Sequence, residues 1–169
     1  MNNIILGNLF AIFAMCSDSI SSSQKTAKRV LLVQCASQVF YGLGSLVLGG
    51  YSAVAQSFVS ILRNIAAIRK INNRIIEWTL VGLGVALGLF FNNLGLVGLL
   101  PVIANLEYSI AVFRFKDNER ALKISYMICC LLYAVFSLAI LNFVGVISNM
   151  VIVVTTIIFL IKGKKTKED

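Results

Sequence analysis

The acidic side chain that lies most clearly inside an apolar run is Glu107, in the segment Asn105 to Ser109. A charged group at the centre of a membrane span costs about 2.5–3.5 kcal/mol on insertion scales, so it normally faces other helices and has a partner. Arg63 is the obvious partner, because both residues lie about 12–13 residues inside their runs, or about 18–20 Å at 1.5 Å per residue. We therefore predict a Glu107–Arg63 pair that acts as a structural ion pair or as a coupling site.

Two alternatives to this pair remain open. Arg63 could extend to the cytoplasmic interface while Asn or Ser side chains hold Glu107, which would make both residues purely structural. If the two residues lie apart, Glu107 could instead serve in proton coupling.

Pro101 is the only proline in the chain and lies in the first two turns of an apolar run. Its ring removes a backbone hydrogen bond and can kink a helix, so we predict a hinge there. Other polar side chains inside apolar runs either line a cavity or join neighbouring helices by hydrogen bonds worth roughly 0.6 kcal/mol each. They are Gln56, Ser60, Asn64, Asn105 and Ser148, of which Asn105 is included among the predicted substrate-binding residues.

The chain has few residues of the types that carry out catalysis or bind metals. The chain has no histidine, which removes the commonest general base and the commonest metal ligand. Its four cysteines lie in apolar runs without a CxxC pair, which favours small buried residues over disulfides or metal ligands. We predict no catalytic residues, no metal and no cofactor, and expect that the protein is not an enzyme.

The composition indicates an all-α protein with many membrane spans. Of 169 residues, 59% are hydrophobic and 13% charged, whereas soluble domains are about 45–50% apolar and about 25% charged. The net charge of +8 comes from basic residues between apolar runs. This pattern fits the positive-inside rule better than nucleic-acid binding, so lipid and a small solute are the expected partners.

Seven apolar runs are long enough to span a membrane as helices. They cover roughly 3–20, 30–48, 52–68, 75–91, 94–113, 122–141 and 143–161.

The breaks between these runs alternate between charged and uncharged. Uncharged breaks occur at 49–51, 92–93 and 142, and the charged ones are 24–29, 69–74, 114–123 and the tail from Lys162. With seven spans, all basic residues lie at or toward one face, which should be cytoplasmic. We expect a multi-pass protein of the bacterial inner membrane with its N-terminus outside, its C-terminus in the cytoplasm and an uncleaved first helix.

The breaks also repeat at an offset of 92 residues. At this offset 24–29 falls on 116–121, 49–51 on 141–143, and Lys70 on Lys162. Three spans, a linker span and three more spans give two like-facing three-helix units related by an axis along the membrane normal. The predicted divisions are 1–70, a linker helix at 71–92, a second unit at 93–162 and a cytoplasmic tail at 163–169.

Three stretches carry a resemblance to known proteins: Val33 to Ala53, Ile61 to Ile65, and Leu99 to Ala104. Together with the 3+1+3 plan they resemble the SWEET, SemiSWEET and PQ-loop (MtN3-like) superfamily, and within it the bacterial inner-membrane protein family Imp-YgjV. The resemblance covers most of the chain and implies a bundle of two parallel three-helix repeats. It does not name a substrate.

In SWEET-like families an aromatic residue on the second helix of a repeat and an Asn on the third, 16 residues apart, line the central site. Tyr133 and Asn149 have this spacing, and Tyr41 and Ser57 are the equivalents in the first repeat. Here Tyr replaces Trp at both aromatic positions and Ser replaces one Asn. The resemblance thus implies a site for a neutral polar solute, sugar-like or vitamin-like, although these tyrosines could also be core or interface residues.

The function that we predict is transport of a small solute through a central cavity between the repeats. The alternative is a receptor, assembly or lipid-interacting protein on the same fold, because fold alone does not decide function. A polar cavity between the repeats would favour transport, and a dry, packed centre would favour the alternative. Gly82 to Gly88 in the linker run predict close packing against neighbouring helices or against a second copy in a homo-oligomer.

Overall fold

The computed structural model describes residues 1–22, 27–69, 71, 73–114 and 119–165. Parts of each predicted charged break, including Lys25, Lys70, Lys116 and the tail end with Lys167, lie outside these residues. The described residues are almost entirely helical. Their elements are α1 (Asn2–Ser22), α2 (Ala27–Val47), α3 (Tyr51–Ile68), α4 (Arg74–Phe90), η1 (Val97–Leu99), α5 (Leu100–Arg114), α6 (Glu119–Ala139) and α7 (Phe143–Lys165).

The prediction of an all-helical fold with seven helical segments is confirmed for the described part of the chain. Its membrane-spanning character is visible in one helix. Over Asn2–Ile20, α1 is long and apolar enough to cross a bilayer, whereas the apolar stretches of α2, α5, α6 and α7 are shorter.

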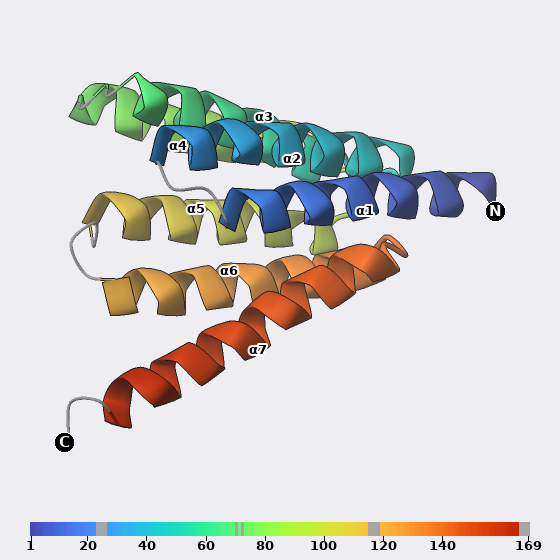
Figure 1. Cartoon of the computed structure of the whole chain (residues 1–169). Coiled ribbons are helices and arrows are strands. Elements are labelled where there is room, and N and C mark those ends of the chain that lie inside the picture. The colour runs from blue at the N-terminus through green and yellow to red at the C-terminus, as the bar shows by residue number, and fades with distance from the viewer. Residues whose placement is uncertain (23–26, 70, 72, 115–118, 166–169) are drawn as a thin grey trace.

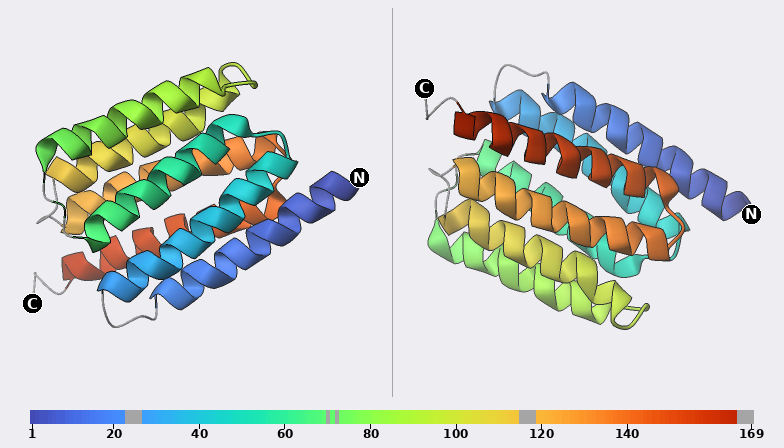
Figure 2. Two further views of the ribbon diagram at one scale, coloured as in Figure 1. Left: turned by 90° about the horizontal axis from the view of Figure 1, so that it is seen from above. Right: turned by 90° about the horizontal axis from the view of Figure 1, so that it is seen from below.

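Consecutive helices run in opposite directions, so the two ends of the chain lie at opposite ends of the bundle (Figure 1). Six helices form a closed ring in which each packs against the next: α1, α2, α3, α5, α6 and α7. The ring closes through the contact of α7 with α1, and α3 packs against α5. The remaining helix, α4, packs on the outside against α3 and α5. Figure 2 shows this layout from above and below, with α4 at one edge beside α5. The α3–α5 and α1–α7 contacts are therefore the two places where the ring joins its first three helices to its last three.

The α2–α3 and α6–α7 turns have the same backbone geometry, 92 residues apart. Gly49 and Leu141 are both left-handed, with φ of 78° and 59°. The next residue in each turn donates its N–H to a serine carbonyl: Gly50 to Ser45 at 2.7 Å, and Asn142 to Ser137 at 2.8 Å. The 92-residue offset predicted from the charge pattern therefore also relates two turns that share a left-handed residue and the same backbone hydrogen bond.

Each of these turns also accepts a hydrogen bond from the other half of the chain. The Asn8 amide donates to the Leu141 carbonyl at 3.0 Å, and the Asn93 amide donates to the Gly49 carbonyl at 2.8 Å. The side-chain Oδ1 of Asn8 in turn accepts from the Val144 N–H at 3.0 Å. Since Leu141 and Gly49 are equivalent at the 92-residue offset, the two halves brace each other at matching points.

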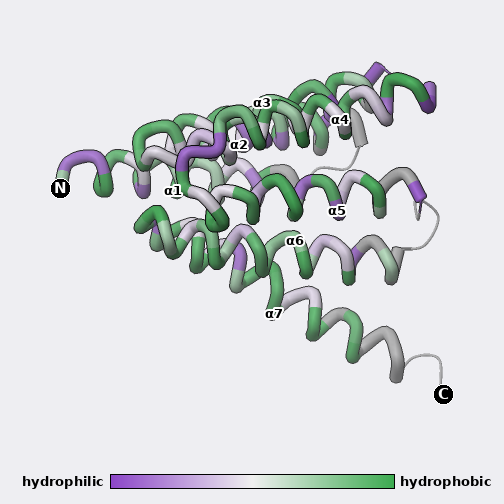
Figure 3. The backbone as a smooth tube through the Cα atoms, turned by 180° about the vertical axis from the view of Figure 1, so that it is seen from behind, coloured by the Kyte–Doolittle hydropathy of each residue, from purple (hydrophilic) through white to green (hydrophobic). Residues whose placement is uncertain are grey.

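The interior contains many small and polar side chains beside a small apolar cluster around Phe136, and many large apolar side chains lie on the surface. Ala14, Ala104, Ser37, Ser52 and Gln56 are all 0% exposed, whereas Phe90 and Leu96 are more than 80% exposed. Hydrophobic residues occur along every labelled helix (Figure 3). Small residues at helix contacts allow close approach of the backbones. This distribution is the reverse of that in a soluble domain, where such a large exposed apolar surface does not persist.

The structure places Pro101 and the cysteines. Pro101 is the second residue of α5, directly after η1, where a helix N–H has no intrahelical partner to lose. It marks the start of α5, and its role as a hinge stays a prediction. The cysteines are free, as expected, and Cys129 and Cys130 are buried, but Cys16 is exposed on α1. Cys16 lies on the outer surface of α1, which also exposes Ile12, Phe13 and Ile20.

Candidate functional site

Arg63 on α3 lies against α5 and is only partly exposed. Its Nη1 donates to the side-chain oxygen of Asn105 at 3.3 Å and to the Ser109 hydroxyl at 3.1 Å. Its guanidinium carbon lies 5.5 Å from the centroid of the Tyr108 ring. Asn105 and Ser109 are four residues apart and so share one face of α5. We call Arg63, Asn105, Tyr108 and Ser109 the Arg63 cluster.

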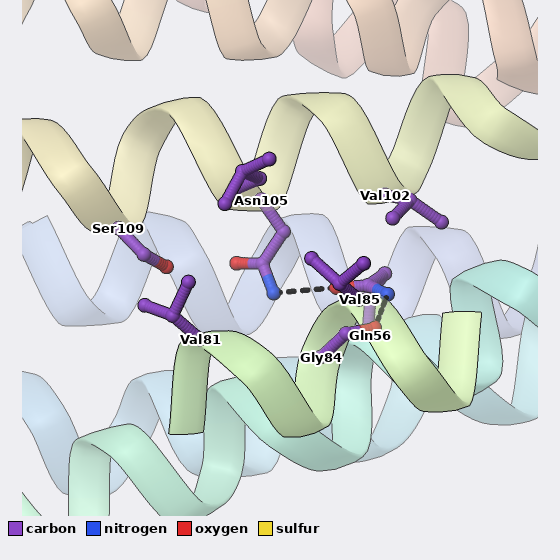
Figure 4. A pocket seen from close by; sticks show the side chains of 8 residues that line it. Gln56, Val81, Gly84, Val85, Val102, Asn105 and Ser109 are labelled. Atoms are coloured by element: carbon purple, nitrogen blue, oxygen red, sulfur yellow. Dashed lines mark hydrogen bonds between the residues drawn. The ribbon is translucent and has the colours of Figure 1, made fainter. Parts of the chain in front are cut away.

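The Arg63 cluster continues into α3 and α4 through a chain of amides. The Asn105 Nδ2 donates to the Gln56 Oε1 at 2.6 Å, and the Gln56 Nε2 donates to the Gly84 carbonyl at 2.8 Å (Figure 4). Arg63 can only donate and a carbonyl can only accept, so the two ends fix the orientation of both amides. Side chains of α3 and α5 and a backbone carbonyl of α4 are thereby joined in one directed network.

Two glycines of α4 make room for this network. A Cβ atom on Gly84 would lie 3.5 Å from the Gln56 Oε1, and one on Gly88 would collide with the Gln56 Nε2 and with Val102. The close packing predicted for the linker helix is therefore found at Gly84 and Gly88, whereas Gly82 has nothing within 4 Å. The space between α3, α4 and α5 that Gln56 and Asn105 line has no room for a water molecule (Figure 4).

The predicted Glu107–Arg63 pair is not formed in the described part of the chain. Glu107 lies two residues after Asn105, which turns its side chain about 200° away from the face that meets Arg63. Its Oε2 is buried and has no hydrogen-bond partner. Depth along the helix matched, as predicted, but the helical phase separates the two charges.

A second group of polar side chains joins α1, α2 and α7. The Tyr41 hydroxyl donates to the Asp18 carboxylate at 3.0 Å and lies 3.5 Å from the Ser148 hydroxyl. We call Asp18, Tyr41 and Ser148 the Asp18 cluster. The sequence analysis singled out Tyr41 and Ser148 but missed Asp18. An acidic residue inside the first apolar run was the available signal.

The remaining predicted site residues are less connected. Ser57 is buried against Gly42 on α2, where a glycine Cβ would lie 3.4 Å from the serine Cβ. The Asn149 amide donates to the Gly145 carbonyl of its own helix at 2.8 Å. Tyr133 on α6 is half-buried. No hydrogen bond joins Tyr41 to Ser57 or Tyr133 to Asn149 in the part of the chain that the structure describes.

Helix α6 lies between the two clusters. Cys129 is within electrostatic range of Arg63, and the adjacent Cys130 is within range of Asp18. The rings of Tyr108 and Tyr126 meet with centroids 5.2 Å apart. The interior thus contains a basic cluster at the α3–α5 contact and an acidic cluster at the α1–α2–α7 contact, with α6 facing both.

A helical bundle with many polar residues inside and aliphatic residues outside is typical of a membrane protein. In agreement, the model of a family described as a bacterial inner membrane protein matches residues 5–167, and the chain belongs to this family, Imp-YgjV. No curated protein and no solved structure matches the chain.

Proposed function

We propose that this inner-membrane protein crosses the bilayer seven times and moves a small polar solute between two like-facing three-helix units, in the manner of SWEET-like transporters. The observation that carries the proposal is the placement of the two clusters. Arg63 of α3 bonds to Asn105 of α5, and Tyr41, which donates to Asp18, lies 3.5 Å from Ser148 of α7, so each cluster reaches from the first three helices of the ring to the last three. A relative movement of the units would open or close both contacts.

The repeat is supported by equivalent contacts. Exchange of α1, α2 and α3 with α5, α6 and α7 converts the α1–α7 contact into the α3–α5 contact, and both occur. The matching turns at Gly49 and Leu141 agree with the same exchange. We therefore keep the division into a unit at 1–70, a linker helix at 71–92 and a unit at 93–162, with α4 outside the ring.

Seven spans are supported by the exposed apolar residues, which occur on helices that are individually short. Ile5, Phe58, Val135 and Ile147 are all more than 50% exposed and come from four different helices. A bilayer is the solvent that such a surface requires. Alkaline phosphatase and fluorescent-protein fusions at the C-terminus test the orientation: fluorescence without phosphatase activity is expected, and the reverse would contradict a cytoplasmic C-terminus.

The transport test is solute entry into proteoliposomes that contain the purified full-length protein. Sugars, nucleosides, vitamins and small organic acids form the panel. We expect at least one solute to enter faster than into protein-free vesicles, and Tyr41→Phe, which removes the hydroxyl bound to Asp18, to slow that entry. Tyr51→Phe, at an exposed tyrosine, is the matched control and should leave entry unchanged. Equal entry for every solute with and without protein would refute transport.

One observation favours the second candidate, a receptor, assembly or lipid-interacting protein. The pocket beside Gln56 and Asn105 admits no water. A network that stays dry and closed in all conditions would serve structure alone. Cysteine substitution at Val81, which lines this pocket, distinguishes transport from a purely structural role. If a water-soluble maleimide labels the cysteine and a transported solute changes the rate of labelling, movement is supported. Complete protection from the maleimide supports the scaffold.

A further inference from the structure

We propose that Arg63 is a binding site for an oxyanion, a carboxylate or phosphate group, carried by the solute that the protein moves. The inference rests on the proposed function and changes its substrate class from a neutral to an anionic solute. The geometry that carries it is a guanidinium held between helices by neutral groups alone.

Arg63 has no acidic partner among the described residues. The groups that contact it are the Asn105 amide oxygen, the Ser109 hydroxyl and the Tyr108 ring, none of which carries a negative charge. Cations within membrane spans normally pair with an anion, because an uncompensated charge is costly there. Glu107, the acidic residue of α5, lies near Tyr108 and Cys129 as Arg63 does, but it makes no ion pair with Arg63 among the described residues and its Oε2 has no hydrogen-bond partner.

The arrangement also leaves donor capacity unused. A guanidinium carries five N–H groups in a planar fork, and both hydrogen bonds found for Arg63 come from Nη1. The remaining N–H groups suit the bidentate contact that arginine makes with carboxylates and phosphates. Arg63 is partly exposed, so this capacity is not sealed inside the bundle.

The network behind Arg63 holds the fork in place before a ligand arrives. Asn105 is itself fixed by Gln56, and Gln56 by the Gly84 carbonyl. A pre-positioned arginine loses less side-chain entropy when it binds than a free surface residue. An arginine that only anchored the chain at the interface would not need three helices to orient it.

Two sources could supply the oxyanion: a water-soluble solute or the phosphate of an anionic lipid. Arg63 lies five residues before the end of α3 at Ile68, about 7.5 Å at 1.5 Å per residue, so a lipid headgroup is within reach. The test therefore has two arms. One adds sodium phosphate or sodium succinate, and the other adds phosphatidylglycerol to the micelles, with phosphatidylcholine as its reference.

The experiment measures the Tm of the full-length protein in an uncharged maltoside detergent, with sodium chloride at equal ionic strength as the reference. We expect phosphate or succinate to give a saturable rise in Tm, about 5–10 °C at a hundredfold excess over Kd. Arg63→Gln should abolish the rise and Arg63→Lys should weaken it. Arg69→Gln, which removes an exposed charge just beyond α3, is the matched control and should keep it.

No rise with either anion, or an equal rise in Arg63→Gln, would overturn the site. A rise with phosphatidylglycerol alone would overturn its assignment to a solute. If Arg63→Gln does not fold, the modification of wild-type Arg63 by phenylglyoxal, measured by peptide mass spectrometry, replaces the variant. Phosphate should slow this modification, and an unchanged rate would overturn the site. Binding without uptake in proteoliposomes would refute transport but not the site, and uptake without anion binding would refute the site but not transport.

Discussion

Replacement of Gln56 by leucine should destabilise the protein through the amide chain rather than through lost volume. Gln56 is fully buried and makes two hydrogen bonds, one from Asn105 and one to the Gly84 carbonyl. Leucine has a similar size but no polar atoms, so both bonds disappear. The Asn105 Nδ2 is then left without its acceptor in a pocket that holds no water.

The expected cost follows from the two parts of this loss. Interhelical hydrogen bonds within membranes contribute about 0.6 kcal/mol each on average, so two give about 1.2 kcal/mol. A buried donor without a partner adds about 1–3 kcal/mol. The predicted decrease in the free energy of unfolding is therefore about 2–4 kcal/mol.

Reversible unfolding in mixed micelles, followed by the fluorescence of Trp78, measures this change. Ser52→Ala is the matched control on the same helix, because Ser52 is also fully buried but its hydroxyl has no partner. Removal of that hydroxyl should leave stability unchanged or raise it slightly. Equal effects of Gln56→Leu and Ser52→Ala, or a Gln56→Leu cost below about 0.5 kcal/mol, would refute the reasoning that the amide chain holds α3, α4 and α5 together.

Two further pairs of variants test the packing and the turns in the same unfolding assay. Gly88→Ala should destabilise the protein, because its Cβ would collide with Gln56 and Val102, whereas Gly82→Ala has open space and should be neutral; equal costs would contradict the close approach of α4. Gly49→Ala should cost about 1–2 kcal/mol, because a φ of 78° is unfavourable for any residue that has a Cβ. The new Cβ would meet no other atom within 4 Å, so the cost would come from backbone strain alone. Leu141→Gly removes the same strain and should be neutral or stabilising, and a clear loss of stability there would count against strain at this turn.

Most helix limits could be predicted because glycine and asparagine interrupt the apolar runs. The runs at 52–68 and 75–91 differ from α3 and α4 by a residue at most at either end. The fifth run was less accurate: it was predicted from 94, but α5 begins at Leu100 after η1. A left-handed Gly95 keeps the chain out of an α-helix before that point, and apolar composition alone does not show it.

The site was harder to predict because periodicity gives depth but not the direction of a side chain relative to an unknown neighbour. Arg63 and Asn105 were both selected, yet their contact with each other depends on how α3 and α5 are rotated. Glu107 had the right depth for Arg63 and the wrong helical phase. Asp18 was overlooked because a single carboxylate near the end of an apolar run resembles an ordinary helix terminus.

The bracing of each turn by an asparagine from the other half has a consequence for the order in which the chain folds during synthesis. The Asn93–Gly49 bond spans 44 residues, and the Asn8–Leu141 bond spans 133. Closing the longer loop costs about 1 kcal/mol more in chain entropy. The turn at Gly49 can be secured as soon as Asn93 has left the ribosome, whereas the turn at Leu141 depends on the first helix, which must remain available until Leu141 has emerged.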